Sequence, residues 1–446
     1  MNIAFIHFRV GETDGVSLEM DKWKHELEHM GHTVYYISGH SHGINAFEIE
    51  ELEYQNAVDE RLAHLCFVDM DGYSEKDIDQ MIVHRSDGLA QKLMALFSLK
   101  RIDLLIAHNV FSLGKSIPVA LGIFKAINLS GVQVIAHHHD FYWEREKYAN
   151  PTCQSVVKYL ELLFPPQLLN IKHIVINALA QKALQQKKGI QSVVVPNVFD
   201  FHAKPWKIDA YNQDFLSKIG VSNQDIVFLQ ATRVVERKAI ELAVDFVSAI
   251  NRKLKGMGAS VLANGKQLTS KSNIVLLIVG LQEAENDYTK NLIDHINNQQ
   301  VKVVMNQDLI THTRTQTSTK KTYSLWDAYA HADFITYPSI YEGWGNQFLE
   351  AVFARKPLML FEYPVFESDI KSFGFTYVSL GNSFHRSETG LISVNPDVME
   401  SAADETLDIL FDAKTYEAMV LRNFEICEKH FSYPVLRKII HTLIRK

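Results

Sequence analysis

The stretch "PNVFDFHAKPWKIDAYNQ" (residues 196–213) divides the chain into two halves that show the same alternation of elements. On each side of it, short runs rich in Val and Ile alternate with stretches of helical spacing. Continuous apolar runs are typical of strands buried on both faces, and their alternation with helices is typical of a parallel sheet. At 446 residues the chain is also longer than one hydrophobic core usually supports. The sequence therefore predicts an α/β protein with two Rossmann-like domains.

The individual elements can be read from these runs. In the first half the expected strands are "IAFIHF" (3–8), "TVYYIS" (33–38), "DLLIAH" (103–108), "VQVIAHH" (132–138), "HIVIN" (173–177) and "SVVVP" (192–196). In the second half they are "IVFLQAT" (226–232), "IVLLIVG" (274–280), "VKVVM" (301–305) and "DFITYPS" (333–339). Helices are expected near 16–30, 116–127, 238–254, 285–298 and 324–331. Because ligands of open parallel sheets bind beyond the carboxyl ends of the strands, we expect functional residues in the loops that follow strands.

Composition narrows the class of protein. A formal net charge of −7 argues against nucleic acid as the main partner. The three cysteines, Cys66, Cys153 and Cys427, fit neither a disulfide framework nor a zinc motif, which indicates a reducing compartment. The sequence shows no secretory signal pattern, and its longest apolar runs fall short of the roughly 18 residues that a membrane span needs. We expect a cytoplasmic protein without a transmembrane segment.

The segment "YEGWGNQFLEA" (341–351) has the composition of a ligand-binding turn. Gly343 and Gly345 allow unusual backbone angles and close approach of a ligand, and Asn346 is a plausible N-cap of the helix that follows. The start of that helix offers free N–H groups and the positive end of its dipole to an anion.

Two carboxylates flank this turn. Glu350 lies about one helical turn in, where its oxygens could accept hydrogen bonds from the hydroxyls of a ribose, and Glu342 could contact another hydroxylated ring. A phosphate, a ribose and a sugar together describe a nucleotide sugar. The alternative is an ordinary capped helix with two solvated acids.

A second segment favours the ligand interpretation. "LQATRVVERK" (229–238) places Arg233 just after a strand and Lys238 five residues later. Two cations at the carboxyl end of a strand suit a diphosphate, because Arg binds it bidentately and Lys adds a point charge. The alternative is a surface charge cluster. We expect both cations to matter more for turnover than for folding.

The sequence resembles the retaining glycosyltransferases of family four, which have the GT-B fold. The segment from "ADFITYPSIYEGWGNQFLEA" (332–351) to "ARKP" (354–357) is similar to their signature, including the Glu–seven residues–Glu spacing. "TRVVERK" (232–238) resembles their Gly-Arg…Lys-Gly element and "VVVPNVFD" (193–200) their Pro-Asn-Gly-Val-Asp linker. "GVSLEMDKWKHELEHMGHTV" (15–34) resembles their first helix. The resemblance covers nearly the whole chain in the expected order.

This resemblance implies a domain organisation. It implies two Rossmann-like domains facing across a cleft, with residues 1–200 on the acceptor side and residues 201–425 binding the nucleotide sugar. Residues 426–446 would form a C-terminal helix that packs back on the first domain. The basic, amphipathic segment "VLRKIIHTLIRK" (435–446) would belong to this helix, and peripheral membrane contact is the alternative.

Roles for single residues follow from the same resemblance. Glu350 would hold the ribose and Glu342 the transferred sugar, while Arg233 and Lys238 would hold the diphosphate. His139, in "VIAHHHDFYW" (134–143), would lie near the reacting sugar. The implied catalytic residues are His139, Glu342, Arg233 and Lys238. The implied donor-binding residues are Gly15, Arg233, Lys238, Glu342, Gly343, Gly345, Asn346, Gln347 and Glu350.

The implied reaction is transfer of a hexosyl group from a UDP- or GDP-sugar to an acceptor hydroxyl, with retention of configuration. It requires neither a metal ion nor another cofactor, because protein cations and a helix start face the diphosphate. The stretches "HFRVGETDGVSLE" (7–19) and "LFEYPVFESDI" (360–370) resemble relatives that act on small soluble acceptors such as glycerate derivatives. Two substitutions depart from the family pattern: Asp14 replaces the first glycine of a pair, and Ala239 replaces the glycine after the lysine.

Other interpretations compete with this one. Asp69 and Asp71 form the Asp-x-Asp pattern of metal-dependent GT-A transferases. "HNVFSLGKS" (108–116) nearly spells a Walker A loop but has Asn109 in place of its first glycine. His137 and His139 share a strand face and could bind zinc, although polar groups lining a cleft are favoured. A non-catalytic nucleotide-sugar-binding protein and a pyridoxal-phosphate-dependent phosphorylase of the same architecture complete the alternatives.

Overall fold

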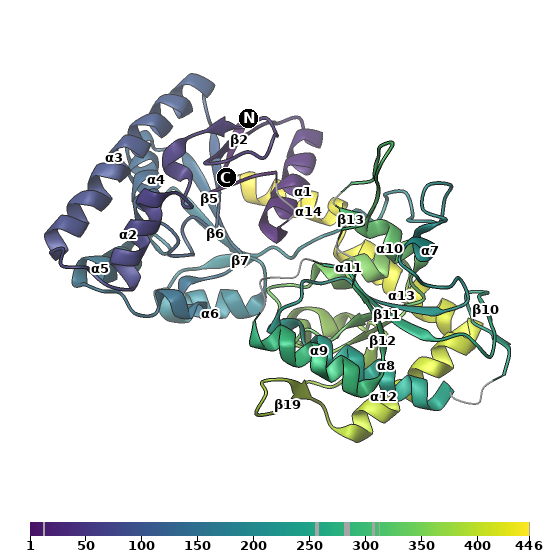
Figure 1. Ribbon diagram of the computed structural model, residues 1–446. Coiled ribbons are helices and arrows are strands. Elements are labelled where there is room, and N and C mark those ends of the chain that lie inside the picture. Colours follow the sequence, from purple (N-terminus) through teal and green to yellow (C-terminus); the bar gives the residue numbers. More distant parts are fainter. Residues whose placement is uncertain (12–13, 255–257, 281–285, 306–307, 312, 446) are drawn as a thin grey trace. The chain divides into compact units, whose positions relative to one another are not determined.

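The computed structural model describes residues 1–11, 14–254, 258–280, 286–305, 308–311 and 313–445. The chain divides into two compact units, the first formed by residues 1–197 and 433–446 and the second by residues 198–432 (Figure 1). Each unit is a parallel sheet with helices packed against it.

Unit 1 is built on a seven-stranded sheet with the order β3-β2-β1-β4-β5-β6-β7. All its strand pairs are parallel, and Phe5 lies opposite Ile106 where β1 pairs with β4. Its strands are β1 (Asn2–Ile6), β2 (Thr33–Ser38), β3 (Phe47–Glu48), β4 (Leu104–His108), β5 (Gln133–His138), β6 (Ile171–Val175) and β7 (Ser192–Val194). The central strands are buried along their length, as the continuous apolar runs predict.

The helices of unit 1 begin at capping residues that the sequence supplies. Asp14 accepts hydrogen bonds from the backbone N–H groups of Val16 and Ser17, and Ser74 caps α3 with a capping box. These helices are α1 (Gly15–His29), α2 (Ala57–Phe67), α3 (Glu75–Lys100), α4 (Ile117–Ser130), α5 (Gln154–Leu163), α6 (Ala178–Lys188) and α14 (Tyr433–Ile444).

Unit 2 is built on a six-stranded parallel sheet with the order β12-β11-β8-β16-β17-β18. Its strands are β8 (Ile226–Gln230), β11 (Ile274–Ile278), β12 (Lys302–Met305), β16 (Phe334–Tyr337), β17 (Leu358–Leu360) and β18 (Val378–Ser379). Its helices are α7 (Phe215–Lys218), α8 (Ile240–Leu254), α9 (Asp287–Gln299), α10 (Leu325–His331), α11 (Asn346–Phe353), α12 (Pro396–Phe411) and α13 (Ala413–His430). Smaller strands are β9 (Ser260–Val261), β10 (Gln267–Leu268), β13 (Ile310–Thr311), β14 (Thr315–Gln316), β15 (Lys321–Ser324), β19 (His385–Arg386) and β20 (Ile392–Ser393).

The strand order fixes where a ligand should bind in each unit. In unit 1 the chain runs from β1 outward to β2 and β3 and then returns to the other side of β1 with β4. In unit 2 it runs from β8 outward to β11 and β12 and returns to the other side of β8 with β16. Such a reversal opens a crevice at the carboxyl ends of the two strands that flank it. The loops after β1 and β4, and those after β8 and β16, are therefore the places to search.

The C-terminal helix α14 belongs to unit 1. Its apolar residues Leu436, Ile440 and Leu443 are buried, and Arg437 Nε donates to Glu26 Oε2 of α1 at 2.6 Å. The unit boundaries fall at 197/198 and 432/433, a few residues from the expected 200/201 and 425/426, because α13 continues to His430. Among the described residues, no helix is long and apolar enough to cross a membrane.

Candidate active site

A buried ion cluster lies at the strand reversal of unit 2. Lys238 ends a 3₁₀ turn after β8, and Glu342 lies in the loop between β16 and α11. Lys238 Nζ donates to one oxygen of Glu342, and Arg237 Nη1 donates to the other at 2.9 Å. Because β8 and β16 are neighbours, residues 104 positions apart meet here.

The charges of this cluster do not balance. Burial alone would raise the pKa of Glu342, but the charges of Lys238 and Arg237 hold it below its usual value. Burial lowers the pKa of Lys238, Glu342 opposes this effect, and Arg237 and Arg233 add to it. Two cations thus bond to one carboxylate, which leaves an excess of one positive charge at the place where the fold opens a crevice.

Arg233 and Lys238 differ in their surroundings. Arg233 is exposed, whereas Lys238 is 9% exposed and paired with Glu342. We therefore expect Lys238, unlike Arg233, to contribute to stability as well, because its removal would leave a buried carboxylate without one of its partners.

The loop that carries Glu342 requires a glycine at position 345. Gly345 has φ +122°, and a Cβ there would lie 2.2 Å from the hydroxyl of Tyr363 and 2.8 Å from that of Tyr337. The hydroxyl of Tyr363 in turn donates to the carbonyl of Trp344 at 2.7 Å. The N-cap of α11 is Gly345 and not Asn346 as the sequence suggested; Asn346 is the first helical residue. The glycine takes that place because the turn needs a backbone angle that other residues rarely adopt.

Glu350 lies one turn into α11, as expected, and accepts a hydrogen bond at 2.8 Å from the hydroxyl of Tyr329. Gln347 is buried, and its Nε2 donates to the carbonyl of Thr336 at 3.2 Å. Gly343 is partly exposed beside Glu342. Arg237 and Tyr329 were not predicted from the sequence, because no spacing rule pairs either of them with its carboxylate.

Ala239, which replaces the glycine that follows the lysine in the family pattern, adopts the backbone conformation of a glycine. It adopts φ +47°, in the left-handed region that favours glycine, and α8 begins at the next residue. The backbone geometry of the glycine-containing motif is thus kept without the glycine.

In unit 1 the sequence predicted Gly15 and His139 as site residues. Gly15 is the first residue of α1, and a Cβ built there meets no described atom within 4 Å. His139 directly follows β5, is partly exposed, and donates its backbone N–H to Asn109 Oδ1 at 2.8 Å. His138 lies buried and shares a hydrogen bond of 3.0 Å with His173.

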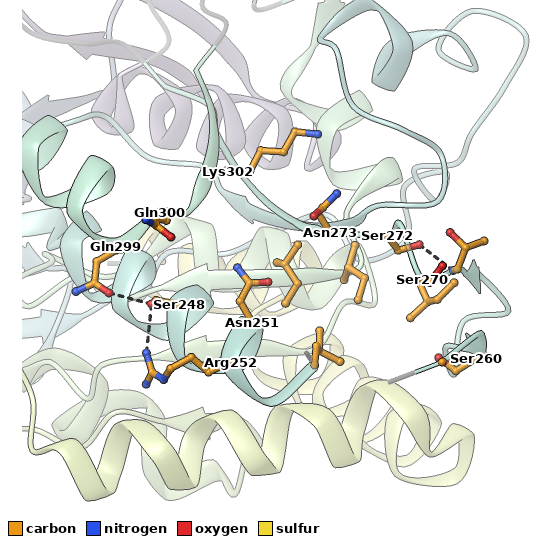
Figure 2. Close-up of a pocket in the computed structure, with 16 residues that line it drawn as sticks. Ser248, Asn251, Arg252, Ser260, Ser270, Ser272, Asn273, Gln299, Gln300 and Lys302 are labelled. Atoms are coloured by element: carbon orange, nitrogen blue, oxygen red, sulfur yellow. Dashed lines mark hydrogen bonds between the residues drawn. The ribbon is translucent and has the colours of Figure 1, made fainter. Parts of the chain in front are cut away.

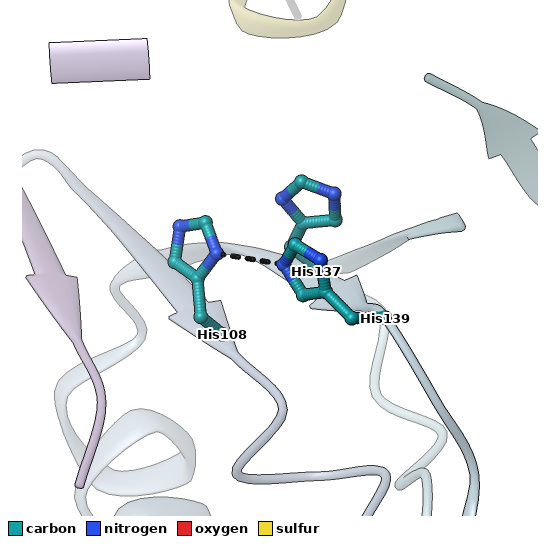
Figure 3. A group of neighbouring side chains, drawn as sticks. All are labelled: His108, His137 and His139. Atoms are coloured by element: carbon teal, nitrogen blue, oxygen red, sulfur yellow. Dashed lines mark hydrogen bonds between the residues drawn. The ribbon is translucent and has the colours of Figure 1, made fainter. Parts of the chain in front are cut away.

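Three imidazoles gather at the carboxyl ends of β4 and β5 (Figure 3). His108, His137 and His139 each place a ring nitrogen within 4.8 Å of the others, and His108 Nδ1 lies 3.3 Å from His139 Nε2. Burial lowers the pKa of His139 to about 4, while Asp140 and Asp14 oppose this effect. The imidazole of His139 is therefore neutral at pH 7. Such a group could also serve as a ligand set for a metal such as zinc.

Another hollow of unit 2 lies at the amino ends of the strands. It measures about 720 Å³ and is bordered by Ile226, Ile274 and Lys302, the first residues of β8, β11 and β12 (Figure 2). Ser248, in its wall, hydrogen-bonds Gln299 at 2.9 Å. Because parallel α/β sheets bind ligands at the carboxyl ends of their strands, we assign no ligand to this hollow.

The side chains of the two competing motifs, the Asp-x-Asp pair and the near-Walker segment, form contacts within the protein. Asp71 pairs with Arg61 and lies 3.2 Å from His64, while Asp69 Oδ1 accepts the backbone N–H of Asp71 at 2.6 Å. Asn109 has φ +55° and accepts from Ser112 at 3.1 Å. The near-Walker segment is thus a turn fixed by an asparagine side chain.

Two parallel-sheet units, with a cationic loop at the strand reversal of the second, define the class of GT-B glycosyltransferases. A glycosyltransferase from Rickettsia africae shares the fold, with a TM-score of 0.61 and 13% identity over 99% of this chain and 97% of that one. Residues 212–420 match the family model of glycosyl transferases group 1. The mannosylglucosylglycerate synthase of Petrotoga mobilis is 40% identical over 98% of this chain and 100% of its own. That of Thermotoga maritima is 38% identical over 99% of both chains. The chain belongs to the group 1 glycosyltransferases, and this fold excludes the GT-A alternative based on Asp69 and Asp71.

Proposed function

We propose that the protein is a retaining family-four glycosyltransferase that moves a mannosyl group from a nucleoside-diphosphate mannose to a hydroxyl of glucosylglycerate. Two relatives of 40% and 38% identity, similar over nearly the whole chain, are mannosylglucosylglycerate synthases. The observation that carries the proposal is the excess of cations around Glu342, which suits a diphosphate.

The donor would be held through its charged and hydroxylated parts. Arg233 and Lys238 would bind the diphosphate, and Glu350 would accept hydrogen bonds from the ribose hydroxyls. On binding, the diphosphate would replace Glu342 as the ion-pair partner of Lys238 and Arg237. The oxygens of Glu342 could then accept hydrogen bonds from the transferred sugar. Gly15, the first residue of α1, would let a phosphate of the donor come close to the backbone, because glycine has no side chain.

The chemistry would rest on stabilising the leaving group. As the bond from the sugar to the diphosphate breaks, negative charge develops on the diphosphate oxygen, and the cations stabilise that charge without a metal ion or other cofactor. The leaving oxygen would take the proton of the acceptor hydroxyl, and that hydroxyl would attack the same face of the sugar, so the configuration is kept. His139, neutral at pH 7, would hydrogen-bond a sugar hydroxyl and position the reacting carbon without acting as acid or base.

The three cysteines, which are free thiols, suit a reducing compartment, and we place the reaction in the cytoplasm.

Nucleoside-diphosphate release tests the proposal. The protein is incubated with GDP-mannose, UDP-mannose or UDP-glucose in the presence and absence of glucosylglycerate. We expect one mannosyl donor to support acceptor-dependent release. Glu350→Gln should weaken binding of the free nucleoside diphosphate by roughly 1–3 kcal/mol in calorimetry. His139→Ala should instead lower turnover and leave that binding nearly intact. Tight nucleotide binding without turnover on any donor would make the chain a non-catalytic binding protein and overturn the proposal.

A further inference from the structure

A hollow of about 240 Å³ lies at the strand reversal of unit 1, among the loops after β1 and β4. His7 and Arg9 follow β1 in its wall, and Asn109 and Lys115 follow β4. A parallel sheet with this strand order binds ligands at this place, at the carboxyl ends of the strands where the order reverses. We call this space the anion hollow.

The wall of the anion hollow is cationic although the chain as a whole carries a net charge of −7. Its cations are Arg9, Lys115, Arg145 and Lys147, and its carboxylates are Asp14 and Asp140. Both carboxylates already have partners in the protein. Asp14 caps α1 and accepts from the Ser17 hydroxyl at 2.8 Å, and Asp140 accepts from Arg145 at 2.7 Å. The lining of the hollow therefore has four cations and two carboxylates.

Lys115 is the cation of this lining whose charge is most affected by its surroundings. Burial lowers its pKa, Arg9 lowers it further, and Asp140 and Asp14 only partly oppose the effect. Its ammonium group lies 4.7 Å from the ring centre of Tyr54 and 5.6 Å from that of Phe8. An anion bound in the hollow would restore the charge balance around this lysine.

A second space of about 530 Å³ shares Lys115, Lys147 and Tyr148 with the anion hollow. Its wall includes the rings of Tyr54, Phe67 and Tyr148, and the last two pack edge to face at 5.2 Å. Adjoining cationic and aromatic walls suit a ligand with an acidic end and a less polar body such as a sugar ring.

The anion hollow also adjoins the histidine assigned to the reaction. Asp140, in its wall, directly follows His139, and His7 is close enough to His139 for each imidazole charge to disfavour the other. Lys115 and Asp14 act on the same His7. A ligand bound in the anion hollow would therefore have part of its own structure close to His139.

We propose that the anion hollow binds the acceptor by its carboxylate, with Lys115 and Lys147 as specificity-determining residues. This inference rests on the proposed function for the identity of the acceptor. The carboxylate of the glycerate would lie among Arg9, Lys115, Arg145 and Lys147, and the attached glucose would lie toward His139 or against the aromatic wall.

A matched pair of acceptors tests this assignment. Glucosylglycerate and glucosylglycerol share the sugar and differ in the carboxylate, so the ratio of their kcat/KM values measures its recognition. We expect Lys115→Met to lower this ratio roughly 10- to 100-fold, the range for loss of a charge-assisted hydrogen bond. Lys147→Met, at an exposed position, should act in the same direction and serves if Lys115→Met does not fold. Lys158→Met, at an exposed position on α5, is the control and should keep the ratio.

Calorimetric binding of the two acceptors separates this inference from the proposed function. Tighter binding of glucosylglycerate that depends on Lys115 would support the inference even if no sugar is transferred, and the proposed function would then fail alone. Transfer to both acceptors with equal kcat/KM would overturn the inference and leave the proposed function intact. If Lys115→Met weakens binding of the free nucleoside diphosphate as much as binding of glucosylglycerate, the cations belong to the donor and the inference is wrong.

Discussion

Unit 1 should lose much of its stability when the pH falls from about 6.5 to 4, because it buries neutral histidines. Burial lowers the pKa values of His7, His139 and His173 to about 4, and those of His108, His137 and His138 fall well below the usual value. In the unfolded chain each of these imidazoles takes up a proton near pH 6.5. Between the two pKa values the unfolded state binds more protons, so the free energy of unfolding decreases as the pH falls.

The size of the effect follows from the values near 4. For His7, His139 and His173, a fall from 6.5 to about 4 corresponds to about 3 kcal/mol of unfolding free energy each, at about 1.4 kcal/mol per pKa unit. The three contributions do not add fully, because His7 and His139 repel each other when charged. Burial raises the pKa values of Glu19 and Glu144. At these two groups the folded state binds more protons than the unfolded state, so they oppose the loss of unfolding free energy as the pH falls. A domain is stable by about 5–15 kcal/mol, so a loss of several kcal/mol removes a large part of the stability of unit 1.

Peptide-resolved hydrogen exchange between pH 8 and 4, corrected for intrinsic exchange rates, would report on each unit separately. We expect protection of β1, β4 and β5 to be lost first. His173→Gln keeps a hydrogen-bond partner for His138 and should reduce the pH dependence by about one proton. His295→Gln is the control in unit 2, where a hydrogen bond that His295 donates to Asp245 raises the pKa of His295. Equal protection of unit 1 at pH 4 and pH 7 would refute the burial of neutral imidazoles.

Four further predictions concern the donor site. Lys238→Met should lower the unfolding free energy by about 2–4 kcal/mol, because a buried carboxylate loses one of its two partners, and unchanged denaturation would exclude the ion pair. Arg233→Ala should leave stability within about 0.5 kcal/mol and reduce turnover roughly 10²–10³-fold; full activity would remove Arg233 from the site. Gly345→Ala should cost about 2–4 kcal/mol of stability, from backbone strain and a displaced tyrosine hydroxyl, and urea denaturation measures it. Turnover should persist in a chelator, and a loss restored by manganese would contradict the metal-free mechanism.

Much of the fold could be predicted from local patterns. The expected helices near 16–30, 238–254 and 324–331 are confirmed as α1, α8 and α10, with ends that differ by one or two residues. β1 ends at Ile6, whereas the apolar run extends to Phe8, because the sheet pairing stops before the run does. Apolar periodicity determines where elements lie, since burial is a property of whole segments.

The candidate site could be predicted only in part. Glu342 and Lys238 were found because a known spacing marks them, but their pairing depends on β8 lying beside β16. Arg237 carries no spacing signal and becomes a partner of Glu342 only through that neighbourhood. Lys115 was read as part of a near-Walker segment, and the cationic wall to which it belongs is assembled from loops more than 100 residues apart in the chain.

Nuclear magnetic resonance analysis of the reaction product is the direct test of mannosyl transfer with retention of configuration. The protein is incubated with the nucleoside-diphosphate mannose that it accepts and with glucosylglycerate, and the anomeric signals of the product are assigned. We expect one new mannosyl group, joined through a glycosidic oxygen to glucosylglycerate, with the anomeric configuration of the donor. A product of inverted configuration would contradict the retaining mechanism. Failure to transfer mannose to glucosylglycerate, while another sugar or acceptor is used, would contradict the proposed substrates.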